Sequence, residues 1–233
     1  MKTLKFVPPI LIAVACLALQ QAKADTFGFD ISVGNPAISG FTGPYVHVTV
    51  STAGNNSSTA SVTFTSLTNG SVAFLMGNGS SFDLNTNGTA LVSGPTFTQG
   101  VGVGFAMSGF STPTVSNLNG SGQVDGFGVL NNVNDMMGGF NKAFSQVTFT
   151  LTKNSGTWAS AADVLKANVQ QAIAAAHIFV ATITNGTVFQ AAGALATGFA
   201  ANGGAQLPDG GTTVMLLGAA LGALGIVRRF IMS

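Results

Sequence analysis

Residues 146–151 read QVTFTL, and residues 61–65 read SVTFT, so apolar and polar side chains alternate in both segments. A β-strand points successive side chains to opposite faces, and such a segment therefore buries one face and leaves a Thr-rich face in water. A sheet with one wet face is typical of antiparallel pairing. These two segments predict antiparallel strands, and the rest of the chain is interpreted around them.

Further runs rich in Phe and β-branched residues predict more strands of the same kind. Asn-Gly pairs separate several of the runs, and this dipeptide accepts the positive φ angles of two-residue hairpin turns. Many short strands with such turns predict an all-β fold, an antiparallel β-sandwich of jelly-roll-like type. The predicted strands are 27–33, 45–51, 60–65, 72–75, 82–84, 101–107, 124–130, 146–152 and 177–184, and the Asn-Gly pairs begin at Asn69, Asn78, Asn87, Asn119 and Asn185.

One stretch departs from this pattern. Residues 158–176 are rich in Ala and contain neither Gly nor Pro, which predicts one or two short helices. The body that these elements form spans residues 25–200. We expect it to be one domain, since a chain of this size buries a sufficient core without disulfides or metals.

Charge is scarce, because only 6 % of the 233 residues are charged. Between residues 25 and 206, Lys142, Lys153 and Lys166 stand against six Asp, with no Glu and no Arg. A body without a basic patch cannot neutralise phosphates, which excludes nucleic acid as an expected partner. The single cysteine, Cys16, precedes the body, so disulfides are not expected there.

The N-terminus has the pattern of a signal peptide. Lys2 and Lys5 precede an apolar run at 6–19, and Ala22 and Ala24 are the small residues that signal peptidase accepts before its cut. We expect residues 1–24 to form a signal helix that is removed, leaving Asp25 as the first residue of the exported protein.

The C-terminus combines a short motif, an apolar segment and a basic end. A linker at 201–211 ends in Leu207, Pro208, Asp209, Gly210 and Gly211. Residues 212–229 follow as an expected transmembrane helix whose apolar run, 214–227, covers about 21 Å against a hydrocarbon core of about 30 Å. Arg228 and Arg229 act as the membrane stop and hold residues 230–233 in the cytoplasm, which places the body outside.

This tail resembles the PEP-CTERM class of sorting signals of Gram-negative bacteria, in the variant with Val-Pro-Asp-Gly-Gly, with Leu207 in place of Val. The resemblance implies that an exosortase cuts near the motif, after transient insertion of the precursor in the inner membrane, and delivers the body to the cell surface or outside the cell. The family name of the tail refers to ice-binding proteins, but it describes the tail only. The body resembles uncharacterised proteins that carry this tail, and no activity follows from that resemblance.

Groups able to perform chemistry are few. Catalysis needs a base, a nucleophile or an electrophile, and His47, His177 and the six Asp are the candidates, without a motif that assembles them. No catalytic residue and no cofactor is predicted. The one weak metal candidate is a calcium site at Asp125, Asn134 and Asp135, which offers fewer carboxylates than calcium prefers.

Binding without catalysis has two candidate surfaces. Tyr45 and Trp158 are the aromatic residues suited to contact a sugar, because each has an apolar body and a polar tip. Ice would need a flat threonine ladder, and Thr63, Thr65, Thr148 and Thr150 offer two Thr-x-Thr steps, although such steps also occur on ordinary solvated strands.

The sequence therefore favours an exported, non-catalytic structural protein of the cell surface or extracellular matrix. The alternatives are a carbohydrate-binding module and, third, a secreted hydrolase. The expected partners are signal peptidase, exosortase, and extracellular polysaccharide or a second copy of the chain, since unpaired strand edges invite pairing.

The two processing sites predict the mass of the exported protein. Intact-mass spectrometry of the full chain, expressed in a Gram-negative host with an exosortase, should give a species that begins at Asp25 and ends near Leu207. Without the exosortase, the same measurement should retain residues up to Ser233. A mature species that keeps residues 1–24 would contradict the signal-peptide assignment.

Overall fold

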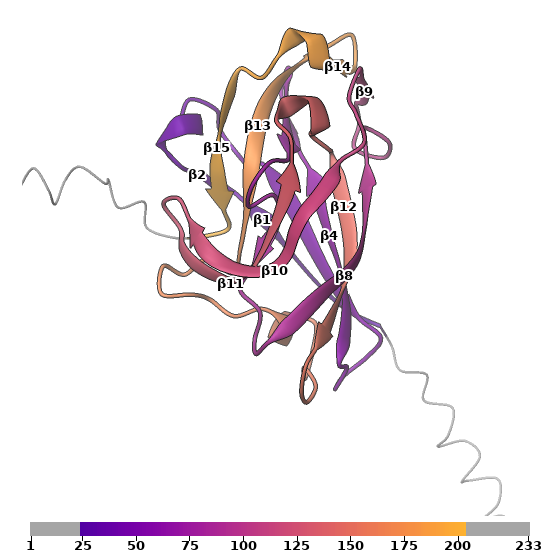
Figure 1. Cartoon of the computed structure of the whole chain (residues 1–233), viewed down its shortest axis with the longest axis vertical. Coiled ribbons are helices and arrows are strands. Elements are labelled where there is room, and N and C mark those ends of the chain that lie inside the picture. Colours follow the sequence, from indigo (N-terminus) through magenta and orange to yellow (C-terminus); the bar gives the residue numbers. More distant parts are fainter. Residues whose placement is uncertain (1–23, 204–233) are drawn as a thin grey trace, which may run out of the picture.

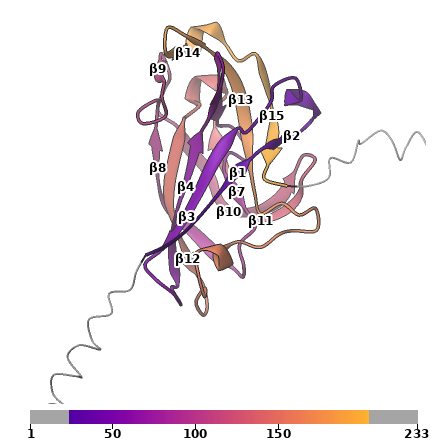
Figure 2. The same ribbon diagram turned by 180° about the vertical axis from the view of Figure 1, so that it is seen from behind.

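The computed structural model describes residues 24–203, which form an all-β body of mostly antiparallel strands with no α-helix in that range (Figures 1 and 2). One sheet has five strands in the order β1-β3-β4-β12-β8. These strands are β1 (Asp25–Ile31), β3 (Val46–Thr52), β4 (Thr59–Ser66), β12 (Gln146–Lys153) and β8 (Ala90–Thr98).

The second sheet has ten strands and centres on the long strand β13, which pairs with β6, β7, β14 and β15. One pair, β14 with β9, is parallel. The strands are β2 (Val33–Gly34), β5 (Thr68–Asn69), β6 (Val72–Met76), β7 (Asp83–Leu84), β9 (Ala106–Ser108), β10 (Thr114–Val124), β11 (Gly128–Met137), β13 (Ala174–Thr184), β14 (Thr187–Phe189) and β15 (Ala196–Ala201). Four 3-10 turns complete the described fold: η1 (Pro36–Ile38), η2 (Phe140–Lys142), η3 (Ala162–Val164) and η4 (Gln190–Ala192).

The alternation read from the sequence is confirmed in the central strands of the five-stranded sheet. In β3 and β12 every apolar residue faces inward, and Val48, Phe149 and Leu151 are buried. Their partners in the main core come from the other sheet and include Phe74 and Ile178. One hydrophobic core therefore joins the two sheets, as expected of a sandwich.

Phe82, immediately before β7, lies at the centre of this core. Its ring centroid lies 5.1–6.3 Å from those of Phe64, Phe97, Phe144 and Phe149, in tilted or edge-to-face geometry in every pair. Such aromatic pairs contribute beyond the area they bury. The cluster ties β4, β8 and β12 to the β7 segment.

The expectation of helices near 158–176 is corrected. The stretch contains only the three-residue turn η3, and Ala174 to Ala176 are the first residues of β13. Those alanines are completely buried, because β13 lies inside its sheet with both faces covered. Small side chains fit such a position, so strand pairing overrides the helix propensity of Ala.

Two of the expected strands are wrong, and each is interrupted at glycine. The run at 101–107 is mostly a turn, since Gly100, Gly102 and Gly104 have φ of 89°, 83° and 83°, and only β9 at its end is extended. The run at 124–130 spans the hairpin between β10 and β11, where the Phe127 amide donates to the Val124 carbonyl. The sequence pattern did not predict β8, most of β10 or β15.

The Asn-Gly pairs do not all make hairpins. Asn185 and Gly186 form the expected two-residue turn, because Thr184 pairs with Thr187 across them. Asn119 instead lies inside β10, at φ of 62°, where the register with β11 shifts.

The processing segments lie mostly outside the described residues. Ala22, the signal helix, the sorting motif at 207–211, the transmembrane segment and Arg228 and Arg229 are among them. Ala24 is exposed and Asp25 begins β1, with its carboxylate accepting a hydrogen bond from the Ala161 amide. Across residues 24–203, no helix has the length and apolarity needed to cross a membrane.

The aromatic cluster makes a prediction about stability. Phe82→Ala should lower the free energy of unfolding by about 3–5 kcal/mol, because it leaves a cavity among four packed rings. Chemical denaturation followed by intrinsic fluorescence measures the change. Leu91→Ala on β8, whose side chain is 47 % exposed, is the control and should change stability little; equal losses in the two variants would contradict the assignment of Phe82 to the core.

Candidate functional site

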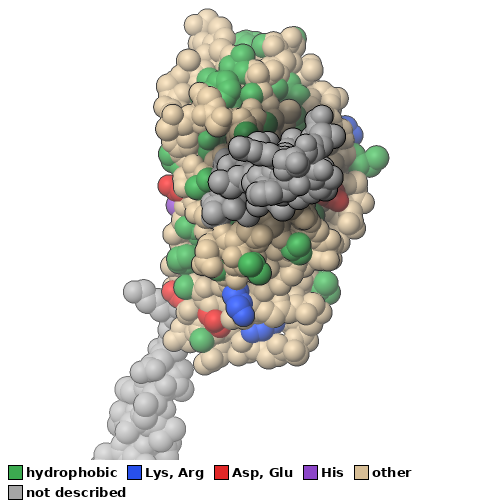
Figure 3. All heavy atoms as spheres, turned by 90° about the vertical axis from the view of Figure 1, so that its left-hand side faces the viewer, with side chains coloured by type: hydrophobic (Ala, Val, Ile, Leu, Met, Phe, Trp, Pro, Cys, Tyr) green, Lys and Arg blue, Asp and Glu red, His purple; other side chains and the backbone are tan. Residues whose placement is uncertain are grey.

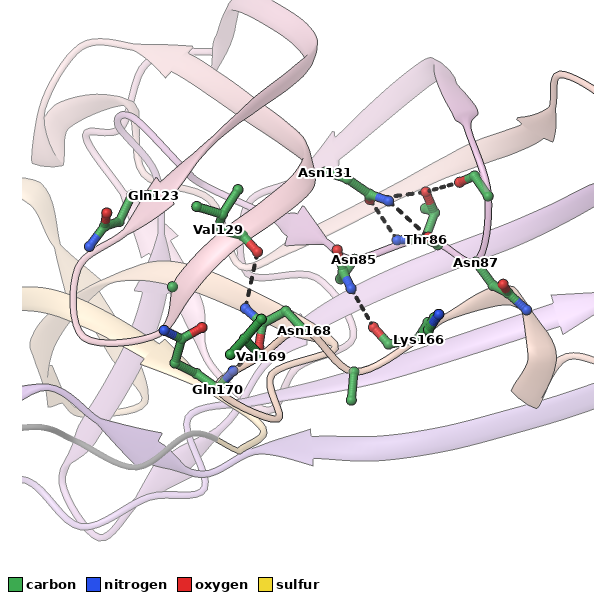
Figure 4. A pocket seen from close by; sticks show the side chains of 13 residues that line it. Asn85, Thr86, Asn87, Gln123, Val129, Asn131, Lys166, Asn168, Val169 and Gln170 are labelled. Carbon is green, nitrogen blue, oxygen red and sulfur yellow. Dashed lines mark hydrogen bonds between the residues drawn. The ribbon is translucent and has the colours of Figure 1, made fainter.

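A pocket of about 610 Å³ opens where the β10–β11 hairpin meets the connections around β7 and before β13 (Figure 4). Three chain segments that are distant in sequence form it. Its lining residues are Asn85, Thr86, Asn87, Gly88, Gln123, Gly128, Val129, Asn131, Lys166, Ala167, Asn168, Val169 and Gln170.

Asn131 on β11 fixes one wall of the pocket. Its side-chain oxygen accepts from the amide of Thr86 at 2.7 Å and from the Thr86 hydroxyl at 3.1 Å, and its amide nitrogen donates to the Thr86 carbonyl at 2.9 Å. This two-way pairing replaces a strand ladder, since β7 is only two residues long. Asn131 therefore holds residues 85–88 against the hairpin.

Asn168 fixes the opposite wall. Its side chain donates to the carbonyls of Phe127 and Val129 at 2.8 and 3.1 Å, and its oxygen accepts from the amides of Gln170 and Ala172, both at 2.9 Å. A side chain with its hydrogen-bonding capacity filled in this way orders the loop around it.

The two walls are also joined to each other. The Asn85 side chain donates to the Lys166 carbonyl at 2.7 Å, and the Lys166 amide donates to the Asn85 carbonyl at 2.8 Å. These two hydrogen bonds hold the segments around Asn85 and Lys166 together at the base of the pocket, although no continuous sheet of the described structure joins them. The pocket is thus built before any ligand arrives, which lowers the entropic cost of binding.

The groups left to meet a ligand are mostly uncharged. The side-chain amides of Gln123 and Gln170 make no hydrogen bond within the described residues, and Figure 4 shows both at the same end of the pocket. Val129 and Val169 are 58 % and 91 % exposed beside them. Lys166 carries the one charge among the lining residues.

This set of groups suits ligand binding by hydrogen bonds and apolar contact. Amides both donate and accept, and the neighbouring valines offer apolar contact, which together match an uncharged ligand that carries hydroxyl groups on an apolar frame. No carboxylate, imidazole or thiol is among the residues that line the pocket. Figure 3 shows one face of the molecule, on which charged side chains are likewise sparse.

Tyr45 and Trp158, which the sequence proposed as sugar contacts, are placed elsewhere. Tyr45 is 3 % exposed and Trp158 is completely buried, so neither ring can stack on a sugar. Their polar tips are used internally, the Tyr45 hydroxyl donating to the Phe41 carbonyl and Trp158 Nε1 to the Asn87 carbonyl. The physical reason is that both rings are part of the main hydrophobic core. Trp158 supports the pocket wall from behind through Asn87.

The two histidines lie apart from the pocket. His47 is on the outer face of β3, with Nδ1 2.6 Å from Oδ1 of Asp30, and both side chains are exposed. His177 on β13 is packed between the rings of Phe179 and Phe199, with Nε2 2.8 Å from the Thr197 hydroxyl. Burial lowers the pKa of His177, against a smaller opposing effect of the Gly79 backbone.

The weak calcium candidates are not brought to one point. Asp125 lies at the tip of the β10–β11 hairpin and accepts from the Asn35 side chain, whereas Asn134 and Asp135 lie near the other end of β11. Asn134 is buried and its amide donates to the Phe82 carbonyl and the Asn132 side chain, while Asp135 accepts from the Ser80 amide. Within residues 24–203, no group of three His, Cys, Asp or Glu side chains is arranged to hold a metal ion.

The threonines considered for ice binding do lie side by side, on the outer face of the five-stranded sheet. Thr63 faces Thr148, with their hydroxyls 2.9 Å apart. The pair belongs to one of three rows of outer-face residues that cross all five strands. A five-stranded sheet twists by about 20° per strand, so a flat crystal face would meet only part of the array. The rows are Thr26, Ser51, Ser61, Thr150 and Ser93; Gly28, Thr49, Thr63, Thr148 and Thr96; and Asp30, His47, Thr65, Gln146 and Thr98.

The sequence analysis missed most of the pocket. Residues 166–170 were expected to be part of a helix, and Asn134 and Asp135, close to Asn131 in sequence, were considered only as weak calcium ligands. Gln123, Asn168 and Gln170 carried no motif. Their one signal was the presence of amide side chains, which also fits ordinary turns.

No family model matches the chain, and neither the curated proteins nor the solved structures contain a match. The chemistry of the pocket therefore carries the functional inference.

Asp83 on β7 makes a prediction about pH. It is completely buried; its Oδ1 accepts from the Asn134 amide at 2.8 Å, whereas Oδ2 has no hydrogen-bond partner in the described structure. Burial raises the pKa of Asp83 well above its ordinary value, and the nearby charge of Asp135 adds to the effect, against the Asn134 and Ser80 hydrogen bonds. Because its pKa is raised in the folded state, Asp83 binds its proton more tightly in the folded chain than in the unfolded chain. This difference stabilises the fold fully below the unfolded pKa of about 4, and the stabilisation is lost as the pH rises through the folded pKa.

Asp83→Asn should remove that loss, since the amide stays neutral and keeps an oxygen for Asn134. Urea denaturation from pH 4 to pH 8 should show a smaller decline in the free energy of unfolding than in the unaltered chain. Asp30→Asn, at an exposed carboxylate, is the control and should leave the decline in place. Parallel pH profiles for Asp83→Asn and the unaltered chain would refute the role of Asp83.

Proposed function

We propose that this chain is an exported, non-catalytic protein of the cell surface or extracellular matrix, and that its pocket binds a neutral polysaccharide. The observation that carries the proposal is the pocket wall itself. It presents the free amides of Gln123 and Gln170 beside the exposed side chains of Val129 and Val169, and its frame is held by hydrogen bonds that need no ligand.

The chemistry of a neutral sugar fits this arrangement. A sugar ring presents hydroxyl groups around its rim and C–H groups on its faces, so it takes hydrogen bonds from amides and apolar contact from valine. A strongly acidic polymer would meet only one cation, Lys166, in the pocket. A charged ligand would therefore lose hydration without a matching number of opposite charges.

The processing signals support the delivery part of the proposal. Cleavage before Asp25 by signal peptidase would leave β1 as the first element of the mature protein, and exosortase processing at 207–211 would follow a short segment after β15. A jelly-roll-like sandwich, the finer form of the fold that the sequence favours, is the scaffold we infer for this role. Its binding site lies between the β10–β11 hairpin and the connections around β7 and before β13.

The proposal is tested by removing the free amides. Gln123→Ala with Gln170→Ala should weaken binding of a neutral polysaccharide about tenfold or more, because two hydrogen bonds of roughly 0.5–1.5 kcal/mol each are lost. Isothermal titration calorimetry of the full chain against a soluble glucan, mannan and galactan measures the change, with an alginate as the acidic comparison.

Gln190→Ala is the matched control, because it removes the same amide from η4, outside the pocket. It should leave binding unchanged. Binding of the alginate alone, or an equal loss in the control and the double variant, would overturn the assignment of the pocket.

A further inference from the structure

Most of the sheet edges in the described structure are protected against pairing with another chain. The outer edge of β8 contains Gly94, at φ of 58°, and Pro95, and its register with β12 shifts between Thr148 and Thr150. A bulge and a proline both interrupt the hydrogen-bonding pattern that an incoming strand would need. In the second sheet, β10 shifts register with β11 at three places, and β2, β5 and β9 have two or three residues each.

The edge strand β1 has none of these protections. All seven of its residues pair with β3 in an unbroken register, from Asp25 with Thr52 to Ile31 with Val46. It contains no Pro and no Lys, and its two charged side chains have partners within the chain, Asp25 in the Ala161 amide and Asp30 in His47. Its outer edge is therefore a regular row of backbone donors and acceptors, with Thr26, Gly28 and Asp30 exposed on one face.

The inner face of β1 is incompletely covered as well. Phe27 and Phe29 pack against the main core but are only partly buried, and their rings lie 5.5 Å apart. The corresponding residues of the interior strand β3, Val48 and Val50, are completely buried. Two partly buried aromatic rings thus lie beside the outer edge of β1, where another strand would cover them further.

The sequence of β1 is nearly symmetric about Gly28, since Phe27 and Phe29 flank it and Thr26 and Asp30 follow on either side. We propose that β1 pairs with β1 of a second copy of this chain, antiparallel and centred on Gly28. The two five-stranded sheets then become one sheet across a two-fold axis.

This pairing is self-complementary, as a two-fold contact requires. Phe27 opposes Phe29 of the second copy, and Phe29 opposes its Phe27, so four rings meet on the inner face. Aromatic pairs across strands are favourable. On the outer face Asp30 opposes Thr26 of the second copy, so the acidic residues do not face each other.

Gly28 lies at the centre of the pairing, on the exposed outer face of β1. A glycine inside a strand has no side chain to pack, so no side chain covers the outer face at the axis. In the dimer the two glycines oppose each other on the axis. The association does not depend on the ligand of the pocket, because none of the residues that line the pocket belongs to β1.

Disulfide trapping tests the pairing and its register. Two residues that oppose each other in antiparallel strands have Cα atoms about 4.5–5.5 Å apart, which suits a disulfide. Gly28→Cys in the full chain, with Cys16→Ser so that the new thiol is the only one, should give a covalent dimer under mild oxidation. The added Cβ would lie 3.3 Å from Nε2 of His47, an exposed ring that can turn aside.

Thr26→Cys is the matched control, on the same strand and the same face. Its two copies would be four residues out of register, about 13 Å apart, too far for a disulfide. It should give at least tenfold less covalent dimer than Gly28→Cys. An equimolar mixture of Thr26→Cys and Asp30→Cys should nevertheless cross-link, because those two positions oppose each other; this arm holds even where Gly28→Cys fails to fold.

Sedimentation of the unaltered chain over a range of micromolar concentrations gives the second measurement, and a dimer should appear as the concentration rises. A monomer at every concentration would overturn the proposal. Equal trapping of Gly28→Cys and Thr26→Cys, or no trapping in the mixture, would overturn the register and with it the two-fold pairing.

Discussion

The body depends on a buried network of asparagine side chains that joins strands whose backbones barely pair. β7 and β11 share a single register pair, Asn132 with Leu84. Asn132 donates to the Ala90 carbonyl of β8 in the other sheet, and Asn134 donates to the Phe82 carbonyl. Asn119 completes the network by bonding the Val92 backbone and the Asn132 side chain. The hydrogen bonds of these side-chain amides connect the two sheets at a place where no backbone hydrogen bonds of a described strand pair do so.

Such a network imposes a strict condition on the sequence. A buried amide stabilises the fold only when its groups are paired, because each unpaired group costs about 1–3 kcal/mol. Asn134 meets the condition with its oxygen and nitrogen both bonded. Asp83 beside it meets the condition only in part, since one of its oxygens has no partner. The interior that joins the sheets is thus also where the protonation of a single group affects stability.

Strand β11, which carries Asn132 and Asn134 of this network, lines the pocket on its other face. Asn131 and Asn132 are neighbours on β11, so their side chains point to opposite sides of the sheet. Asn132 is turned into the core and Asn131 toward Thr86 at the pocket wall. The position of the pocket relative to the core is therefore set by the register of β11. A shift of one residue would place Leu130 at the wall or Val133 at the core contact, depending on its direction, so one of the two amide contacts would be lost.

The sequence predicted the elements in which local pattern and tertiary burial agree. In β12 the alternation of Val147, Phe149 and Leu151 with Thr residues appears directly in the burial of the strand. In β13 the two disagree, because both faces are covered and the alanines carry no alternation. The pocket was beyond sequence reasoning for another reason. Gln123, Asn131 and Asn168 come from three separate segments, and only the pairing of distant strands brings them together.

A shared edge at β1 would change what a single weak pocket can do. The pocket is formed by the second sheet and its connections, so pairing of β1 with β1 leaves both pockets of a dimer open. A polysaccharide repeats the same unit along its length, and a dimer can therefore engage one polymer at two points. The second contact is then intramolecular, and the avidity can exceed the affinity of one site by about 10²–10⁴ without any new contact. In the proposed dimer, a modest affinity of each pocket for a neutral polysaccharide would then be sufficient to retain the protein on an extended polymer.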